Sequence, residues 1–150
     1  MKKQSTIKPT PMLEFFKPDK SKTLLLKLFT NTISAGFPSP AEDFLDKKLD
    51  LNEYLIKNPS ATFLVRVNGN SMIDAGIFNG DILIVDRSVE ATNGRIVIGV
   101  INGEFTVKRI IKSGKKVFLK PENEKFKPIE LTEDMDFKIW GVVIYTIHKT

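Results

Sequence analysis

The chain has 150 residues, of which 41% are hydrophobic and 27% charged, and its formal net charge is +5. This is the length and composition of one globular domain plus at most an arm. The absence of cysteine excludes disulfides, thiol nucleophiles and cysteine-based zinc sites. The single histidine, His148, lies two residues from the C-terminus, which excludes a serine–histidine triad and a multi-histidine metal site. We expect this histidine to lie in solvent.

The positive charge is confined to the first part of the chain. Residues 1–30 contain seven lysines and two acidic residues, whereas residues 31–150 contain 16 basic and 16 acidic side chains. A neutral body argues against nucleic-acid binding by phosphate neutralisation, so we expect no sequence-specific DNA binding. The basic arm is either a solubilising terminus or a weak electrostatic contact for an anionic partner.

Residues 1–34 lack the features of a signal peptide, a membrane span or a DNA-binding domain. The apolar run 24–29 is interrupted by Lys27, and no stretch approaches the roughly 20 apolar residues of a membrane span. Pro9, Pro11 and Pro18 disfavour a long helix, and a helix-turn-helix domain needs roughly 50 residues. We therefore expect a cytoplasmic protein with a flexible N-terminal arm and no membrane contact.

A bond between two small residues follows this arm. Ala35 and Gly36 allow an extended peptide to approach an active site closely, and Pro38 and Pro40 keep the following segment extended. The same residues are also compatible with an ordinary glycine–proline hinge.

Residues 41–57 carry the clearest helical pattern. Leucines recur at nearly 3.6-residue spacing between Pro40 and the pair Asn58–Pro59. This pattern predicts one helix, or two short turns if residues 50–52 interrupt it.

A serine lies between two predicted strands, residues 63–67 and 82–85, which are rich in β-branched side chains. The connection contains several glycines and asparagines, which tolerate the positive φ angles of sharp turns. Ser71 is therefore expected at a turn close to a strand end, with its Oγ exposed and the backbone N–H groups of Ser71 and Asn70 available for an oxyanion. The simpler interpretation is an ordinary turn serine.

A lysine on a later strand is the candidate partner of this serine. Residues 95–101 and 104–111 read as two strands joined by Asn102–Gly103, a strong hairpin signal. Alternation places Thr106, Lys108 and Ile110 on one face of the second strand. Lys108 is either a solvated edge charge or, if that face is buried, an amine of lowered pKa that acts as a general base.

The rest of the chain predicts more strands. Ser113–Gly114 marks a turn into a strand at residues 115–120, residues 121–128 read as a charged surface loop, and residues 137–145 read as a long core strand. Many short strands with one modest helix predict a mainly β fold with a curved, partly barrel-like sheet.

Four stretches, taken together, resemble the LexA/UmuD family of self-cleaving serine peptidases, which is distantly related to bacterial signal peptidases. Their order and spacing match the family from about Ala35 to Tyr145. The resemblance implies the fold just predicted, cleavage at Ala35–Gly36 with Ser71 as nucleophile and Lys108 as general base, and no cofactor or metal. The stretches are 34–40 (SAGFPSP), 69–72 (GNSM), 80–85 (GDILIV) and 103–108 (GEFTVK).

The resemblance is closest to the UmuD branch of this family, and it implies a division of the chain and a set of partners. Residues 1–35 would be an arm removed by self-cleavage, and residues 36–150 the peptidase and interaction domain. Cleavage would be stimulated by RecA filaments on single-stranded DNA during the SOS response. The processed homodimer would join a Y-family polymerase subunit (UmuC-like) for translesion synthesis.

Two alternatives of other classes remain open on the sequence. One is a LexA-like or phage-type self-cleaving transcriptional regulator. The other is a non-catalytic β interaction module in which Ser71 is a turn serine and Lys108 a strand lysine.

Overall fold

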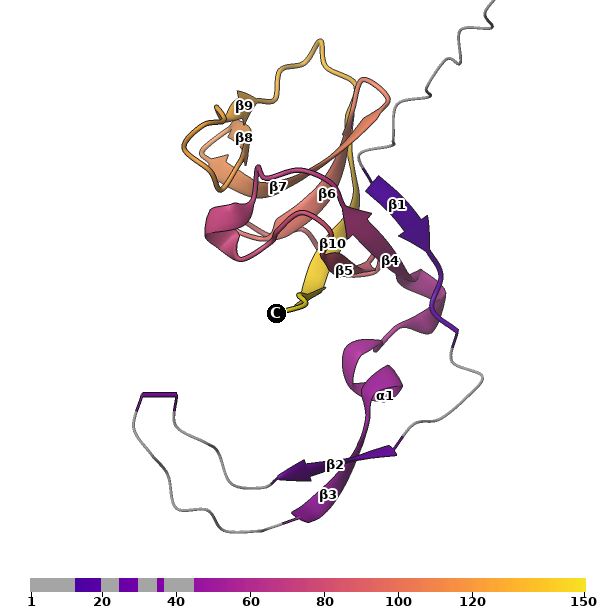
Figure 1. The fold of residues 1–150 in the computed structure, drawn as a ribbon. Helices are drawn as coiled ribbons and strands as arrows, with labels where there is room; N and C mark the ends of the chain where they lie inside the picture. Colours follow the sequence, from indigo (N-terminus) through magenta and orange to yellow (C-terminus); the bar gives the residue numbers. More distant parts are fainter. Residues whose placement is uncertain (1–12, 20–24, 30–34, 37–44) are drawn as a thin grey trace, which may run out of the picture.

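A computed structural model describes residues 13–19, 25–29, 35–36 and 45–150. Eight antiparallel strands form one strongly curled sheet in the order β1-β4-β5-β10-β6-β7-β8-β9, and β2 and β3 form a separate two-stranded ribbon (Figure 1). The prediction of a mainly β, partly barrel-like fold is confirmed. The strands are β1 (Leu13–Phe16), β2 (Leu25–Phe29), β3 (Leu45–Asp50), β4 (Thr62–Val67), β5 (Ile82–Asp86), β6 (Ile96–Ile101), β7 (Glu104–Ser113), β8 (Lys116–Lys120), β9 (Ile129–Glu130) and β10 (Phe137–Ile147); the short helices are α1 (Leu51–Leu55), η1 (Pro59–Ala61) and η2 (Ile73–Ala75).

The hairpin between β6 and β7 forms as predicted. Asn102 and Gly103 both have positive φ, 48° and 83°, as the two central residues of a tight hairpin turn require. The turn fixes the register of the two strands, in which Val97 lies opposite Lys108 and Ile98 opposite Val107. The predicted hairpin therefore determines which residue of β7 faces which side of the sheet.

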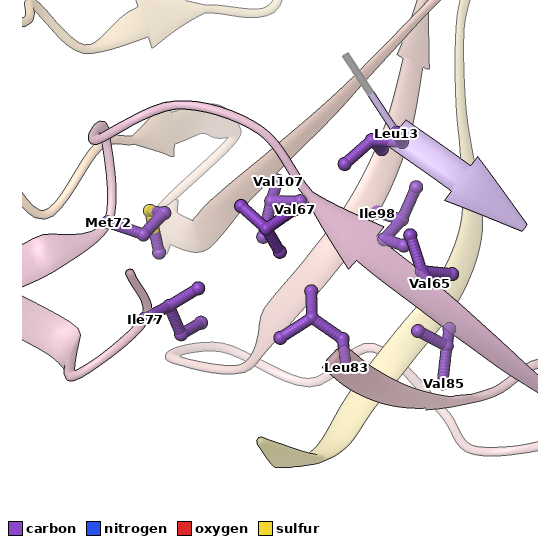
Figure 2. Close-up of a cluster of buried hydrophobic side chains, with 9 residues drawn as sticks. All are labelled: Leu13, Val65, Val67, Met72, Ile77, Leu83, Val85, Ile98 and Val107. Carbon is purple, nitrogen blue, oxygen red and sulfur yellow. The ribbon is translucent and has the colours of Figure 1, made fainter. Parts of the chain in front are cut away.

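Two clusters of buried apolar side chains occupy the two faces of the curled sheet. Neighbouring residues of a strand point to opposite faces, so Val97 and Ile98 belong to different clusters. Figure 2 shows the larger cluster, which contains Leu13, Val65, Val67, Met72, Ile77, Leu83, Val85, Ile98 and Val107. The smaller cluster contains Val97, Ile110, Leu119 and Val142.

The prediction of a helix over residues 41–57 is wrong for most of its length. Residues 45–50 form β3, which pairs antiparallel with β2, and the helix is limited to the five residues of α1. The helix begins there because the side chain of Asp50 accepts a hydrogen bond from the backbone N–H of Asn52, at 3.0 Å. Pairing with a distant strand outweighs the leucine periodicity. Residues 41–44 and the prolines at 38 and 40 lie outside the described residues.

Part of the N-terminal arm belongs to the sheet, which the sequence did not predict. β1 pairs antiparallel with β4, with Leu13 opposite Val67 and Phe16 opposite Leu64. Leu13 is only 7% exposed and lies in the larger core cluster. A segment assigned to the arm is therefore the edge strand of the main sheet.

Candidate active site

The segment after β4 forms a tight loop that carries Ser71. The Met72 side chain is buried in the larger cluster, and its carbonyl accepts hydrogen bonds from the N–H groups of Ala75 and Ile77. The N–H of Gly69 donates to the side chain of Asn79 at 2.9 Å, which ties the start of the loop to its return. Ser71 lies between these two fixed points and is 9% exposed.

Lys108 on β7 lies beside this serine. Its Nζ is 3.2 Å from Ser71 Oγ, 2.8 Å from Thr106 Oγ1 and 3.0 Å from the carbonyl oxygen of Val107. The side chain is 7% exposed, and burial lowers the pKa of its ammonium. Of the two interpretations of this lysine, the solvated edge charge does not fit the structure.

The three neighbours of the amine match the needs of its neutral form. A neutral amine has two N–H donors and one lone pair. In that form the two donors would be used by Thr106 Oγ1 and the Val107 carbonyl, and the lone pair would face the hydroxyl of Ser71. The serine O–H would then donate to Lys108 Nζ, whereas a charged lysine donates to Ser71 Oγ. The geometry is compatible with proton transfer from Ser71 to a neutral Lys108.

The backbone on the N-terminal side of Ser71 is held by Asn123. The side-chain Nδ2 of Asn123 donates to the carbonyl oxygen of Asn70 at 2.8 Å, and Asn123 is 9% exposed. In the described part of the chain, neither the Asn70 N–H nor the Ser71 N–H donates to a backbone carbonyl. Both predicted oxyanion donors are thus in a loop of fixed orientation. Their role in catalysis remains a prediction.

A small apolar pocket opens next to Ser71. Its walls come from the loop and from three strands, β1, β4 and β7, and the lining residues are Leu13, Val67, Asn68, Gly69, Ser71, Met72 and Val107. Leu13 belongs to the arm, and no sequence argument placed it near the serine. The alternation of apolar and acidic residues in residues 13–15 is the only signal that points to a strand there.

Ala35 and Gly36 do not lie at this site in the structure. Both residues are exposed, and a Cβ added to Gly36 would meet no atom within 4 Å. In Figure 1 the short coloured segment at residues 35–36 is drawn beyond one end of the β2–β3 ribbon, apart from β4 and β7. The structure therefore brings together Ser71, Asn70 and Lys108 of the predicted site residues, but not the predicted cleavage bond.

Asn123 was missed because it lies in a loop that reads as a charged surface. Its hydrogen bond to Asn70 spans 53 residues of sequence, and no local pattern predicts such a contact. Thr106 was placed on the correct face of β7, and its hydroxyl is within hydrogen-bonding distance of Lys108 Nζ.

The expectation that His148 lies in solvent is only half correct. The side chain is 46% exposed, but its Nδ1 lies 2.7 Å from Oδ1 of Asp81, a residue that is 4% exposed. The ring also packs against Phe78, with the centroids 4.9 Å apart. This contact fastens the end of the chain to the segment before β5, and sequence alone does not reveal it.

Two further features bear on the class of site. The described residues contain no group of three histidine, cysteine, aspartate or glutamate side chains that could hold a metal ion. No helix within the described residues is long and apolar enough to cross a membrane.

Comparison with known proteins agrees with the geometry. A model of the "Peptidase S24-like" family matches residues 27–144. MucA of Salmonella typhimurium is 42% identical over 123 residues, which are 81% of this chain and 84% of MucA. ImpA of Escherichia coli is 42% identical over 133 residues, 89% of this chain and 90% of ImpA. A LexA repressor of Pseudomonas chlororaphis is 39% identical over 134 residues, 89% of this chain and 64% of the repressor.

The fold, the family match and these relatives define the class of protein as an S24-like peptidase. The chain belongs to the LexA/UmuD family, and the resemblance inferred from its motifs is confirmed.

Proposed function

We propose that this chain is a UmuD-type serine peptidase that cleaves its own Ala35–Gly36 bond with Ser71 as nucleophile and Lys108 as general base. The observation that carries the proposal is the buried amine of Lys108, 3.2 Å from Ser71 Oγ and with its pKa lowered by burial. An uncharged amine at that position activates a serine without a histidine. Membership of the S24-like family supports the same reaction class.

The reaction begins with proton transfer from Ser71 Oγ–H to the neutral Nζ of Lys108. Oγ attacks the carbonyl carbon of Ala35, and the resulting oxyanion accepts hydrogen bonds from the N–H groups of Ser71 and Asn70. The C–N bond to Gly36 then breaks, and the Lys108 ammonium returns its proton to the departing nitrogen, which becomes the α-amine of Gly36.

Hydrolysis of the acyl-enzyme completes the cycle. Lys108 accepts a proton from a water molecule, and the hydroxide attacks the Ala35 ester carbonyl. The proton on Lys108 passes to Ser71 Oγ as it leaves. The products are residues 1–35, which end in a carboxylate at Ala35, and residues 36–150, which keep Ser71, Lys108 and every strand of the main sheet except β1 and would form the interaction domain.

The cleavage segment must move before this reaction can occur. Ala35 and Gly36 are exposed, whereas Ser71 and Lys108 are buried in place. We propose that delivery of the segment, from the same chain or from a second copy, limits the rate. In such a chain the catalytic residues are already in place, and the reaction begins only when the cleavage segment reaches them. This suits a reaction that each chain carries out once.

Membership of the family supports a proposal for the lasting role of the processed domain. We propose that it acts in the bacterial cytoplasm as a homodimer and as an accessory subunit of a Y-family (UmuC-like) DNA polymerase in translesion synthesis. RecA filaments on single-stranded DNA would stimulate cleavage during the SOS response. Because residues 1–30 hold the excess positive charge, cleavage would leave a formally neutral body.

Intact mass spectrometry of the purified chain tests the cleavage proposal. After incubation at mildly alkaline pH, we expect the parent to yield a fragment that begins at Gly36. Ser71→Ala and Lys108→Ala should stay whole, while Lys112→Ala, which removes an exposed lysine of the same strand, should be cut like the parent. If Lys108→Ala is processed at the parental rate, the proposed dyad is wrong.

A second set of conditions distinguishes a chain that cleaves itself slowly from a chain that does not cleave itself. If the parent stays whole alone, RecA, single-stranded DNA and nucleotide are added. Cleavage of the parent but not of Ser71→Ala under these conditions supports the proposal. An intact parent under both sets of conditions favours the non-catalytic interaction module.

A further inference from the structure

β1 is held in the sheet by three kinds of contact. Its backbone pairs with β4 from Leu13–Val67 to Phe16–Leu64. The Glu14 carboxylate lies 3.6 Å from Nε of Arg66. The ring of Phe15 lies against those of Phe105 and Trp140, with 4.8 Å between centroids in each pair.

β1 covers apolar and aromatic side chains of the sheet. Leu13 fills one end and forms a wall of the pocket beside Ser71, together with Val67 and Val107. Phe15 fills the other end, between Phe105 and Trp140. Figure 2 shows Leu13 reaching over the cluster from the end of β1. The covered surface thus has an aliphatic position, a basic rim and an aromatic position along one strand edge.

Among the strands that the structure describes, β1 is the last of the sheet and pairs with β4 alone. If β1 leaves, the outer edge of β4 presents unpaired N–H and C=O groups next to an uncovered apolar surface. Such an edge is a template for the addition of another strand. Main-chain hydrogen bonds would hold the incoming segment, and the two apolar positions and Arg66 would select its sequence.

We propose that the β4 edge is a docking groove for an extended segment of a partner protein and that residues 13–16 of this chain occupy it until the arm is displaced. The segment that fits carries an aliphatic residue, an acidic residue and an aromatic residue in succession, as β1 does. The proposal that cleavage opens the groove rests on the proposed function. The existence of the groove and its sequence preference do not.

The arm is suited to act as a removable occupant. While it is part of the chain, its effective concentration at the groove is in the millimolar range, which excludes weak competitors. Cutting between residues 35 and 36 would make residues 1–35 a separate peptide, held to the body by the pairing of β1 with β4 and of β2 with β3, and dilution would favour its release. A partner segment of the same pattern would then bind without competition.

Fluorescence anisotropy with a labelled peptide tests the groove in the intact chain. The probe has the sequence of residues 10–19, and all proteins carry Ser71→Ala so that no cleavage is needed. The full chain is compared with an arm-open variant, Leu13→Asp with Phe15→Asp. We expect the arm-open variant to bind the peptide about tenfold more tightly, because its own arm no longer competes.

A charge-reversal cycle tests the predicted preference. A peptide in which Glu14 is replaced by lysine should bind the arm-open variant about two- to fivefold more weakly. Arg66→Glu in the protein should restore that peptide and weaken the original one. Equal binding of the original and a scrambled peptide would overturn the proposal, and so would equal binding by the full chain and the arm-open variant.

Two further measurements keep the result decisive. If the double variant fails to fold by circular dichroism, Glu14→Pro opens the arm by removing the backbone N–H of residue 14 and the ion pair with Arg66, while Leu13 and Phe15 are kept. Sedimentation of each sample shows whether a second copy of this chain occupies the groove. Peptide binding that is lost as dimers form would overturn the assignment to a separate partner. Because every protein here lacks Ser71, failure of the groove and failure of the cleavage proposal are independent results.

Discussion

Lys108 and Asp86 are two buried ionisable side chains of the same sheet. The surroundings favour the neutral form of Lys108 but the charged form of Asp86. Burial acts to raise the pKa of Asp86, but hydrogen bonds from Asn58, Ser88 and the backbone of Val89 outweigh it and hold the pKa below its ordinary value. Burial lowers the pKa of Lys108, and no carboxylate is among its hydrogen-bonding partners in the described part of the chain. Burial alone therefore does not decide whether a group is charged. Hydrogen-bond donors around Asp86 favour its ionised form, whereas the surroundings of Lys108 favour the neutral amine that the proposed reaction requires.

Replacing Lys108 by methionine should have the largest effect on function and the opposite effect on stability. Lys108→Met removes the proposed base, so we expect the rate of self-cleavage to fall about 10²- to 10⁴-fold. The same change removes the cost of burying an amine, so the free energy of unfolding should rise by about 0.5–2 kcal/mol. Cleavage is measured by intact mass, and stability by urea denaturation in a Ser71→Ala background.

Lys112→Met is the matched control, because it makes the same change at an exposed position of β7. It should leave both quantities near the parental values. Loss of stability in Lys108→Met would mean that the lysine contributes to the fold, which would break the comparison with Asp86.

Asp86→Asn should lower stability without slowing the chemistry. The carboxylate accepts from Asn58 Nδ2 at 2.8 Å and from the N–H of Ser88 at 2.8 Å, and it is 1% exposed. An asparagine amide in its place carries no charge. Its NH2 group would also replace one accepting oxygen and would face the donors of Asn58 or Ser88. We expect the free energy of unfolding to fall by about 1.5–3 kcal/mol at pH 7, measured by urea denaturation with Trp140 fluorescence in a Ser71→Ala background.

Glu133→Gln, which makes the same carboxylate-to-amide change at an exposed position, is the control and should not measurably alter stability. The folded Asp86→Asn chain with Ser71 intact should cleave itself at close to the parental rate. A large loss of cleavage under conditions where the variant is folded would connect Asp86 to the site and would mean that its role is not purely structural.

The two groups also predict that stability rises with pH in two separate pH windows. Lys108 has a lowered pKa, so between its folded and unfolded pKa values the unfolded chain binds more protons, and stability rises with pH. Asp86 also has a lowered pKa, so its contribution is present above the unfolded pKa and is lost as pH falls through the folded one. The lysine window lies below the ordinary lysine pKa, and the aspartate window lies in acid.

The cleavage rate should report only the lysine window. It should rise about tenfold per pH unit while Lys108 is mostly protonated and then level off. Asp86→Asn should leave this profile unchanged but remove part of the acid sensitivity of folding. A flat rate between pH 6 and 10 in folded protein would contradict a general base at Lys108.

The extent to which sequence predicts this molecule depends on the range of the contacts involved. The central strands could be predicted because β-branched runs and the turn Asn102–Gly103 are local signals. The face of Lys108 followed from alternation along the strand, but its burial depends on the loop that carries Ser71. Residues 45–50 were misassigned because their structure depends on pairing with β2, which outweighs a helical period.

The sequence did not predict β1 or the role of Asn123 because both depend on contacts between distant segments. β1 has only four residues, and its place in the sheet depends on the edge of β4. Asn123 reads as part of a charged loop, although its side chain supports the backbone next to Ser71. Such contacts join residues that are far apart in the sequence, so only the three-dimensional structure reveals them.

Asn123→Ala should have the smallest effect of the four predictions. It tests whether the hydrogen bond from Asn123 to the Asn70 carbonyl matters for cleavage. The variant removes the donor to the Asn70 carbonyl, so the peptide that precedes Ser71 loses one of its fixed points. We expect cleavage to slow about tenfold because the oxyanion donors are less well aligned. The midpoint of the pH profile should not move, since Lys108 keeps its own contacts with Thr106 and Val107. The rate is followed by intact mass across pH.

Asn93→Ala is the matched control, because Asn93 is an exposed loop asparagine whose side chain accepts from the N–H of Lys112 at 2.8 Å. It should cleave like the parent. A shift in the pH midpoint of Asn123→Ala would mean that Asn123 acts on the base rather than on the backbone. An unchanged rate would mean that the buried anchor at Met72 is sufficient to hold the serine, and that the contact from Asn123 only stabilises its own loop.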